Sequence, residues 1–153
     1  MGAQSAFMET ETVFFLLERD IEVPAAAPGK YFTVVPDDGL IERLEDGGPF
    51  AWFNPARRSV GVMGGNALFG QEHCAVAVPL DVVREFRIQP YTGRHADHLE
   101  FCAQLQADDP GTYYNGPVLL TLRGHGLHAL DAFAALFSVA CDVPVQTMEP
   151  FTD

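Results

Sequence analysis

Features that would identify a function directly are scarce in the sequence. The 153 residues include only three cysteines, Cys74, Cys102 and Cys141, and no CxxC pair. An odd number of widely spaced cysteines supports neither a disulfide framework nor a zinc knuckle. Because each cysteine lies among apolar neighbours, we expect reduced thiols and a cytoplasmic setting.

Segments that would direct the chain to a membrane are also missing. The first residues, MGAQSAFMETET, lack the basic region and the apolar core of a secretory signal peptide. No apolar run approaches the roughly 18 residues that are needed to span a bilayer. We therefore expect no membrane partner, and a flexible N-terminus over residues 1–10.

Basic residues are few. The chain has nine Lys and Arg residues against 21 Asp and Glu, which gives a formal net charge of −12 at pH 7, and Lys30 is the only lysine. A field of this sign repels nucleic acid phosphates, so we expect no nucleic-acid partner. The same field favours either high solubility or association with a basic protein.

Familiar catalytic motifs are absent as well. The three serines, Ser5, Ser59 and Ser138, do not occur in a GxSxG pattern. Neighbouring residues of a strand point to opposite faces, so His73 and Cys74 do not predict a Cys–His dyad. The sequence therefore contains no standard nucleophile motif.

The pattern that the sequence does contain is typical of a folded α+β domain. Hydrophobic residues make up 48% of the chain and charged residues 20%, and its length is sufficient for one substantial core. Short runs of β-forming residues between Gly and Pro turns predict about six to eight strands in a mixed, mostly antiparallel sheet. We expect residues 11–153 to form a single domain of this class.

Two longer helices are predicted to pack on this sheet, over residues 94–107 and 127–140. The second helix lies between the predicted strands 118–122 and 143–147. This order predicts a C-terminal βαβ unit, whose helix would lie on the sheet.

Histidine spacing gives one candidate metal site. If residues 94–107 are helical, then His95, His98 and Cys102 lie along one face, within reach of a single metal ion. The alternative is that the histidines are surface residues of the first turn and that Cys102 is a small buried hydrophobe. Because no fourth ligand is in register, we favour the alternative and predict no metal or other cofactor.

Arg123, His125 and His128 give a candidate anion site. The loop 123–126 would lead into the helix 127–140, and free N–H groups at a helix N-terminus attract anions. The loop matches neither GxGxxG nor a P-loop. A tight strand-to-helix connection explains its glycines more simply, and the negative net charge disfavours a bound phosphate.

Aromatic and arginine residues indicate a candidate binding face. A predicted hairpin places Trp52 near Arg57 and Arg58, and Tyr113 and Tyr114 lie in a predicted loop. These residue types are enriched at interface anchors. The alternative is that Trp52 belongs to the core and that the tyrosines only cap a turn.

Three pairs of acidic residues would form a negative rim around this face. They are Asp37 and Asp38, Glu45 and Asp46, and Asp108 and Asp109. Asp38 is also the expected cap of a short helix over residues 39–45. A negative rim speeds association with a basic partner more than it increases affinity.

These observations favour a non-enzymatic binding protein. The leading hypothesis is an acidic inhibitor, monomeric or homodimeric, that sequesters a basic protein partner, as an immunity protein neutralises a toxin. The alternative is a small metal-dependent or anion-binding enzyme. Its residues would be His95, His98 and Cys102, or Arg123, His125 and His128.

Overall fold

A computed structural model of the chain describes residues 11–27, 32–93, 97–107, 116–124 and 126–152. Within these residues it contains eleven strands and two α-helices, α1 (Asp38–Gly47) and α2 (Asp131–Cys141), with two short 3-10 turns, η1 (Ala67–Phe69) and η2 (Leu80–Val82). The strands are β1 (Val13–Leu16), β2 (Ile21–Glu22), β3 (Thr33–Val34), β4 (Phe50–Asn54), β5 (Ser59–Asn66), β6 (Gln71–Pro79), β7 (Val83–Thr92), β8 (His98–Leu105), β9 (Val118–Arg123), β10 (Val145–Thr147) and β11 (Phe151–Thr152).

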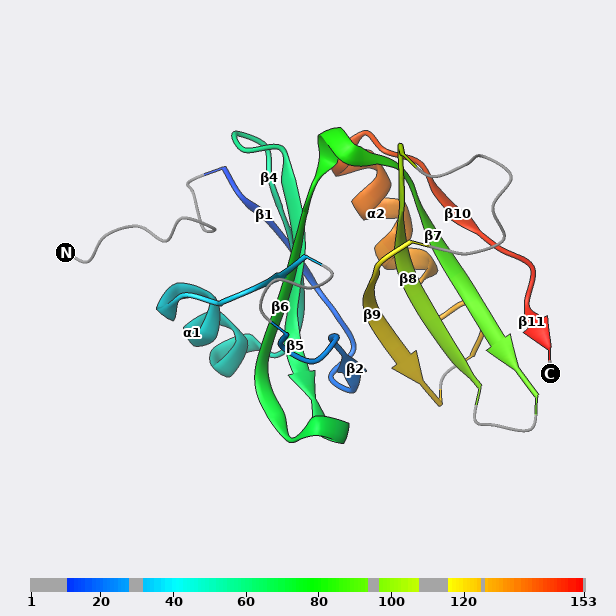
Figure 1. Cartoon of the computed structure of the whole chain (residues 1–153), viewed down its shortest axis with the longest axis horizontal. Coiled ribbons are helices and arrows are strands. Elements are labelled where there is room, and N and C mark those ends of the chain that lie inside the picture. The colour runs from blue at the N-terminus through cyan, green and yellow to red at the C-terminus, as the bar shows by residue number, and fades with distance from the viewer. Residues whose placement is uncertain (1–10, 28–31, 94–96, 108–115, 125, 153) are drawn as a thin grey trace.

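The strands form one mixed sheet that curls into a half-barrel (Figure 1). Its main path runs β1-β4-β5-β2-β9-β8-β7-β10, with β6 and β3 branching from β5 and with β11 beside β7. The pairs β1–β4, β4–β5, β5–β6, β7–β8 and β8–β9 are antiparallel, whereas β10 and β11 run parallel to β7. The short strand β2 joins the two halves, because it pairs with β5 on one side and with β9 on the other.

The main core lies inside the curl, where α2 packs between the two halves of the sheet (Figure 1). Phe137 of α2 contacts Phe15 from β1, Phe86 from β7 and Phe101 from β8, with ring centroids 5.1 to 5.5 Å apart. Phe133, one turn earlier on the helix, contacts Phe15 and Phe101 from the same side. The helix therefore links the β1 end of the sheet to the β7–β8 end.

A second, smaller core lies outside the curl, beneath α1. Its buried members are Leu40 from α1, Phe50 and Trp52 from β4, Met63 from β5 and Ala75 from β6. Trp52 faces Gly61 across the β4–β5 ladder, and a Cβ on Gly61 would lie 2.2 Å from the indole ring. The glycine is thus required for the ring to lie flat on the sheet. Sheet residues alternate between this core and the main core, as the period of a strand dictates.

The predicted fold class is wrong in two respects. The chain is mostly sheet, with eleven strands among the described residues rather than six to eight, and the sheet is curled. The helix predicted over 94–107 is also wrong, because its described part contains strand β8. Leu99, Phe101 and Ala103 face the core with a period of two, and β8 forms a long antiparallel ladder with β7.

The C-terminal strand–helix–strand order is present, with different details. Helix α2 begins at Asp131 instead of 127, because turns occupy the preceding residues. Strand β10 pairs with β7 and not with β9, so β8 and β7 lie between the two strands of the unit. Neither helix among the described residues has the length and apolar character that crossing a bilayer requires.

Candidate binding surface

Helix α1 and its N-cap together carry five acidic residues, Asp37, Asp38, Glu42, Glu45 and Asp46. Asp37 caps this helix, because its side chain accepts a hydrogen bond of 3.0 Å from the Leu40 N–H. The cap is therefore one residue earlier than the sequence predicts. At the other end, Gly48 adopts a φ of 84° and donates its N–H to the Leu44 carbonyl. Glycine suits this left-handed position, which ends the helix.

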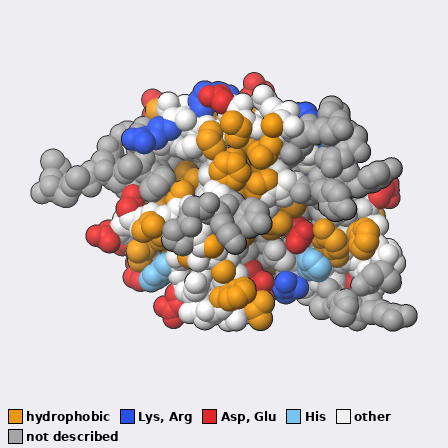
Figure 2. All heavy atoms as spheres, in the orientation of Figure 1, with side chains coloured by type: hydrophobic (Ala, Val, Ile, Leu, Met, Phe, Trp, Pro, Cys, Tyr) orange, Lys and Arg blue, Asp and Glu red, His pale blue; other side chains and the backbone are white. Residues whose placement is uncertain are grey.

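One face of α1 packs on the sheet and the other presents carboxylates to solvent. Leu40 is fully buried, and Ile41 and Leu44 pack against the same small core. The exposed acidic side chains of the helix are Asp38, Glu42, Glu45 and Asp46. Figure 2 shows acidic side chains gathered over this part of the molecule, at the left of the view. We call these four residues the acidic face of α1.

Two basic side chains near α1, Arg43 and His73, contact other residues of the chain. The Arg43 guanidinium lies 3.5 Å from the centroid of the Phe14 ring, a cation–π contact on β1. His73 Nε2 on β6 lies 3.3 Å from the Glu45 carboxylate. Asp38, Glu42 and Asp46 thus keep a negative surface beside the edge of the sheet.

A groove of about 390 Å³ lies between α1 and β1. Leu16 and Phe50 provide its apolar side chains, and Glu42, Arg43 and Asp46 provide its charged ones. Two carboxylates and one guanidinium leave the groove with a net negative charge. Leu16 is 76% exposed, so apolar surface at the groove is open to solvent. We call this cavity the acidic groove.

A second groove, of about 760 Å³, lies on the opposite side of β1, against α2. It is mainly apolar, with Phe15 and Leu17 from the β1 segment and Phe133 and Leu136 from α2 among its lining residues. Leu16 lines both cavities, so the two grooves meet at β1. We call the second cavity the apolar groove.

The structure separates the acidic residues predicted to bind a partner from the aromatic and arginine residues. Asp37, Asp38, Glu45 and Asp46 all belong to α1 or its cap, but Trp52 is fully buried and so presents no surface to a partner.

Arg57 and Arg58 occupy the turn after β4, at the far end of that strand from α1, and Arg58 pairs with Asp81 at 3.1 Å. Asp108, Asp109, Tyr113 and Tyr114 lie outside the described residues.

Glu42 and Leu16 are among the residues of this surface that are missing from the sequence-based prediction. Glu42 lies four positions after Asp38 and four before Asp46, so helical spacing alone would have added it to the set. Leu16 had no such signal, because its place at the end of the sheet depends on which strands pair with β1.

The candidate metal residues are not brought together in the described part of the chain. His98 and Cys102 lie on strand β8, four residues apart, which corresponds to about 13 Å along a strand. His98 stacks on Tyr91 of β7 with a ring separation of 4.5 Å, and Cys102 is buried. His95 lies outside the described residues, and those described contain no group of three or more His, Cys, Asp or Glu placed to hold a metal ion.

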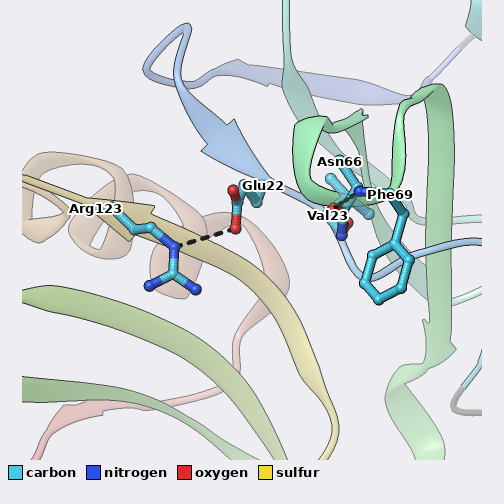
Figure 3. Close-up of polar contacts among 5 residues, drawn as sticks. All are labelled: Glu22, Val23, Asn66, Phe69 and Arg123. Carbon is cyan, nitrogen blue, oxygen red and sulfur yellow. Dashed lines mark hydrogen bonds and ion pairs between the residues drawn. The ribbon is translucent and has the colours of Figure 1, made fainter. Parts of the chain in front are cut away.

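The candidate anion residues have other partners. The Arg123 Nε lies 3.2 Å from Glu22 of β2, as Figure 3 shows. His128 Nδ1 lies 2.9 Å from Asp131, an acidic residue in the first turn of α2. His125 lies outside the described residues. Since α2 begins eight residues after Arg123, the loop does not lead directly into a helix N-terminus.

The three thiols are held in their protonated form. Burial raises the pKa of Cys141 to about 12, and burial together with the nearby Glu100 raises the pKa of Cys102 to about 12. Burial also raises the pKa of Cys74. A protonated, buried thiol is a poor nucleophile and a poor metal ligand, so these residues serve the core.

Comparison with known proteins finds no match to the chain among protein-family models, curated proteins or solved structures.

Proposed function

We propose that this protein is a non-enzymatic binding protein that recognises a basic protein partner through the acidic face of α1 and the adjoining acidic groove. The observation that supports the proposal is the groove itself, where the carboxylates of Glu42 and Asp46 border exposed apolar surface at Leu16. Specific interfaces commonly combine an apolar centre with a polar rim. A groove of this composition suits a lysine or arginine side chain, whose apolar stem and charged head need different surroundings.

The charge of the whole chain supports the same partner chemistry. With a formal net charge of −12, the protein attracts cationic proteins over distances near the Debye length, about 8 Å at physiological salt. The acidic face would raise the association rate, and the apolar contacts would slow dissociation. A toxin with a cationic cleft is one such partner, and the binding protein would then act as its inhibitor by covering that cleft.

A capture experiment with matched charge variants tests the proposal. The test variant is Glu42→Gln, Glu45→Gln and Asp46→Asn, which removes three charges from α1. The control variant is Asp97→Asn, Asp142→Asn and Glu149→Gln, which removes three charges from exposed positions elsewhere. Both keep the hydrogen-bonding shape of the side chains and reach the same net charge.

The immobilised unaltered protein should retain a basic protein from an extract of its natural source at low salt. The test variant should associate with the purified partner about tenfold more slowly than the control variant, because rim charges act chiefly on the association rate. Raising the salt to 0.5 M should remove most of that difference. Equal behaviour of the two variants, or binding that salt does not affect, would contradict the proposal.

A further inference from the structure

Strand β1 lies at one end of the sheet formed by the described residues, and one of its hydrogen-bonding edges has no neighbouring strand there. Among the described residues it pairs with β4 alone. The Leu17 N–H donates to the Pro49 carbonyl at 3.1 Å, just beyond the pairing of Leu16 with Phe50. Because bonded and non-bonded pairs alternate in an antiparallel ladder, Val13 and Phe15 also bond to β4. The backbone N–H and C=O groups of Phe14 and Leu16 therefore point away from β4.

Within the described residues, β1 lacks several of the features that usually prevent strand addition. Edge strands are commonly protected by proline, lysine, an inward-pointing charge or a β-bulge. The sequence of β1 is Val-Phe-Phe-Leu, and its pairing with β4 has no register shift. Val13 is 41% exposed and Leu16 is 76% exposed. An apolar, regular edge of this kind is suited to pairing with another chain.

The two grooves lie on the two faces of this edge. The acidic groove is on the α1 side, where Phe14 packs against Phe50, and the apolar groove is on the α2 side, where Phe15 packs against Phe133. Figure 1 shows the two helices on opposite sides of this half of the sheet. A strand added to β1 would direct alternate side chains into the two grooves, because successive side chains of a strand point to opposite faces.

We infer that the partner of this protein supplies an extended segment that adds to β1 as a further strand of the sheet. The segment alternates basic and apolar residues, with arginine or lysine in the acidic groove and aliphatic side chains in the apolar groove. Charge selects the first set, because Glu42 and Asp46 outnumber Arg43 there. Main-chain hydrogen bonds to Phe14 and Leu16 would add affinity, as in other complexes formed by strand addition. The inference rests on the proposed function and specifies how the basic partner is held.

Synthetic peptides test the mode of binding. The probe is a capped six-residue peptide that alternates arginine and valine, and its control has the same composition with three arginines followed by three valines. Two further probes carry N-methyl groups, one on every arginine amide and the other on every valine amide. A docked strand has one row of amides toward β1 and one row toward solvent, so only one of these two probes should bind.

We expect the alternating peptide to bind at least tenfold more tightly than the block control. One N-methylated probe should keep its affinity, and the other should lose about tenfold or more, since several main-chain hydrogen bonds are prevented. Leu16→Pro removes one outward N–H and should also weaken binding about tenfold, because proline is tolerated at a strand edge and donates no hydrogen bond. As a check that does not depend on this variant, the Phe14 and Leu16 amides of the unaltered protein should exchange more slowly with the peptide bound.

The outcomes separate this inference from the proposed function. If the α1 charge variant weakens peptide binding while both N-methylated probes bind, strand addition is overturned and recognition by the acidic face is retained. If the α1 charge variant binds like its control variant and salt has no effect on binding, both the proposed function and the strand-addition inference are overturned. If the protein alone forms a dimer in sedimentation and Leu16→Pro converts it to monomer, the segment that adds to β1 is a second copy of this chain, and the inference is overturned.

Discussion

Replacement of Gly61 by alanine should destabilise the protein, although the backbone there does not require glycine for its φ angle. An added Cβ would lie 2.2 and 2.3 Å from two atoms of the Trp52 indole, and separations below 3.0 Å are not sustained in folded proteins. The ring would have to move by more than 1 Å to restore ordinary contact. Trp52 is fully buried beside Phe50, Leu40 and Met63, so little free space is available.

Two effects of opposite sign set the size of the change. Alanine restricts the unfolded chain more than glycine does, which stabilises the folded state by about 0.4–1 kcal/mol. Overpacking a filled core costs about 1–3 kcal/mol, and a contact this short belongs at the upper end. The expected net loss in the free energy of unfolding is about 2 kcal/mol, or a fall in Tm of about 4–8 °C for a chain of this length.

A double-mutant cycle with Trp52→Leu isolates the contact. Urea unfolding followed by circular dichroism measures all four proteins, because Trp52 is the only tryptophan and its fluorescence changes with the variants. In the Trp52→Leu background the indole is gone, so Gly61→Ala should cost less than about 0.5 kcal/mol, giving a coupling energy near 2 kcal/mol. A Gly61→Ala cost that is equal in the two backgrounds would refute the packing described beneath α1.

Three further predictions concern stability. Because the Cys102 and Cys141 pKa values are about 12 in the folded chain against 9.0 for an ordinary thiol, the unfolded chain loses these protons first as the pH rises. The free energy of unfolding should fall by up to about 1.4 kcal/mol per thiol per pH unit between pH 9 and 12. Urea unfolding at a series of pH values measures this fall, which should be less steep in the variant with both Cys102 and Cys141 replaced by alanine. The same dependence on pH in the variant and the unaltered protein would contradict the assignment. The side chain of Asn66 donates a buried hydrogen bond of 3.0 Å to the Val23 carbonyl and accepts one of 3.3 Å from the Phe69 N–H (Figure 3). Asn66→Ala removes both and should lower the free energy of unfolding by about 2 kcal/mol. An unchanged midpoint in urea unfolding would contradict this prediction. Asp37→Ala should cost about 1 kcal/mol in thermal melts, and Asp37→Asn should keep most of the stability because it keeps the capping oxygen; equal losses would refute the cap.

The sequence predicted those helices and hairpins whose ends are marked by turn or capping residues a few positions away. The hairpin of β4 and β5 and the helix α1 were found in this way, because a proline-containing turn and an aspartate cap mark their ends. The strand β11 contains only two residues and has no comparable signal. It is a strand only because β7 provides a ladder for it.

The error at β8 has a different physical cause. Both faces of this strand are buried near its centre, since Phe101 faces the core and Cys102 and Gln104 are also buried on the other side. Alternation of apolar and polar residues is then lost, and the segment resembles a helix with an apolar face.

For the binding surface, Asp38, Glu45 and Asp46 of α1 were predicted from the sequence, but Glu42 and the exposed edge of β1 were not. An edge is defined by strand order, which no local pattern contains.

The position of β2 between the two halves of the sheet has a consequence for the order in which the chain folds. Its contacts join residues far apart in sequence, as Glu22 and Arg123 are separated by 101 positions. Closing a loop of this length costs roughly 2–3 kcal/mol more in chain entropy than closing a short hairpin. The hairpins β4–β5 and β7–β8 are local, so each half of the sheet should form in the folding transition state before β2 joins them. Weakening the Glu22–Arg123 pair should then speed unfolding and leave the refolding rate nearly unchanged.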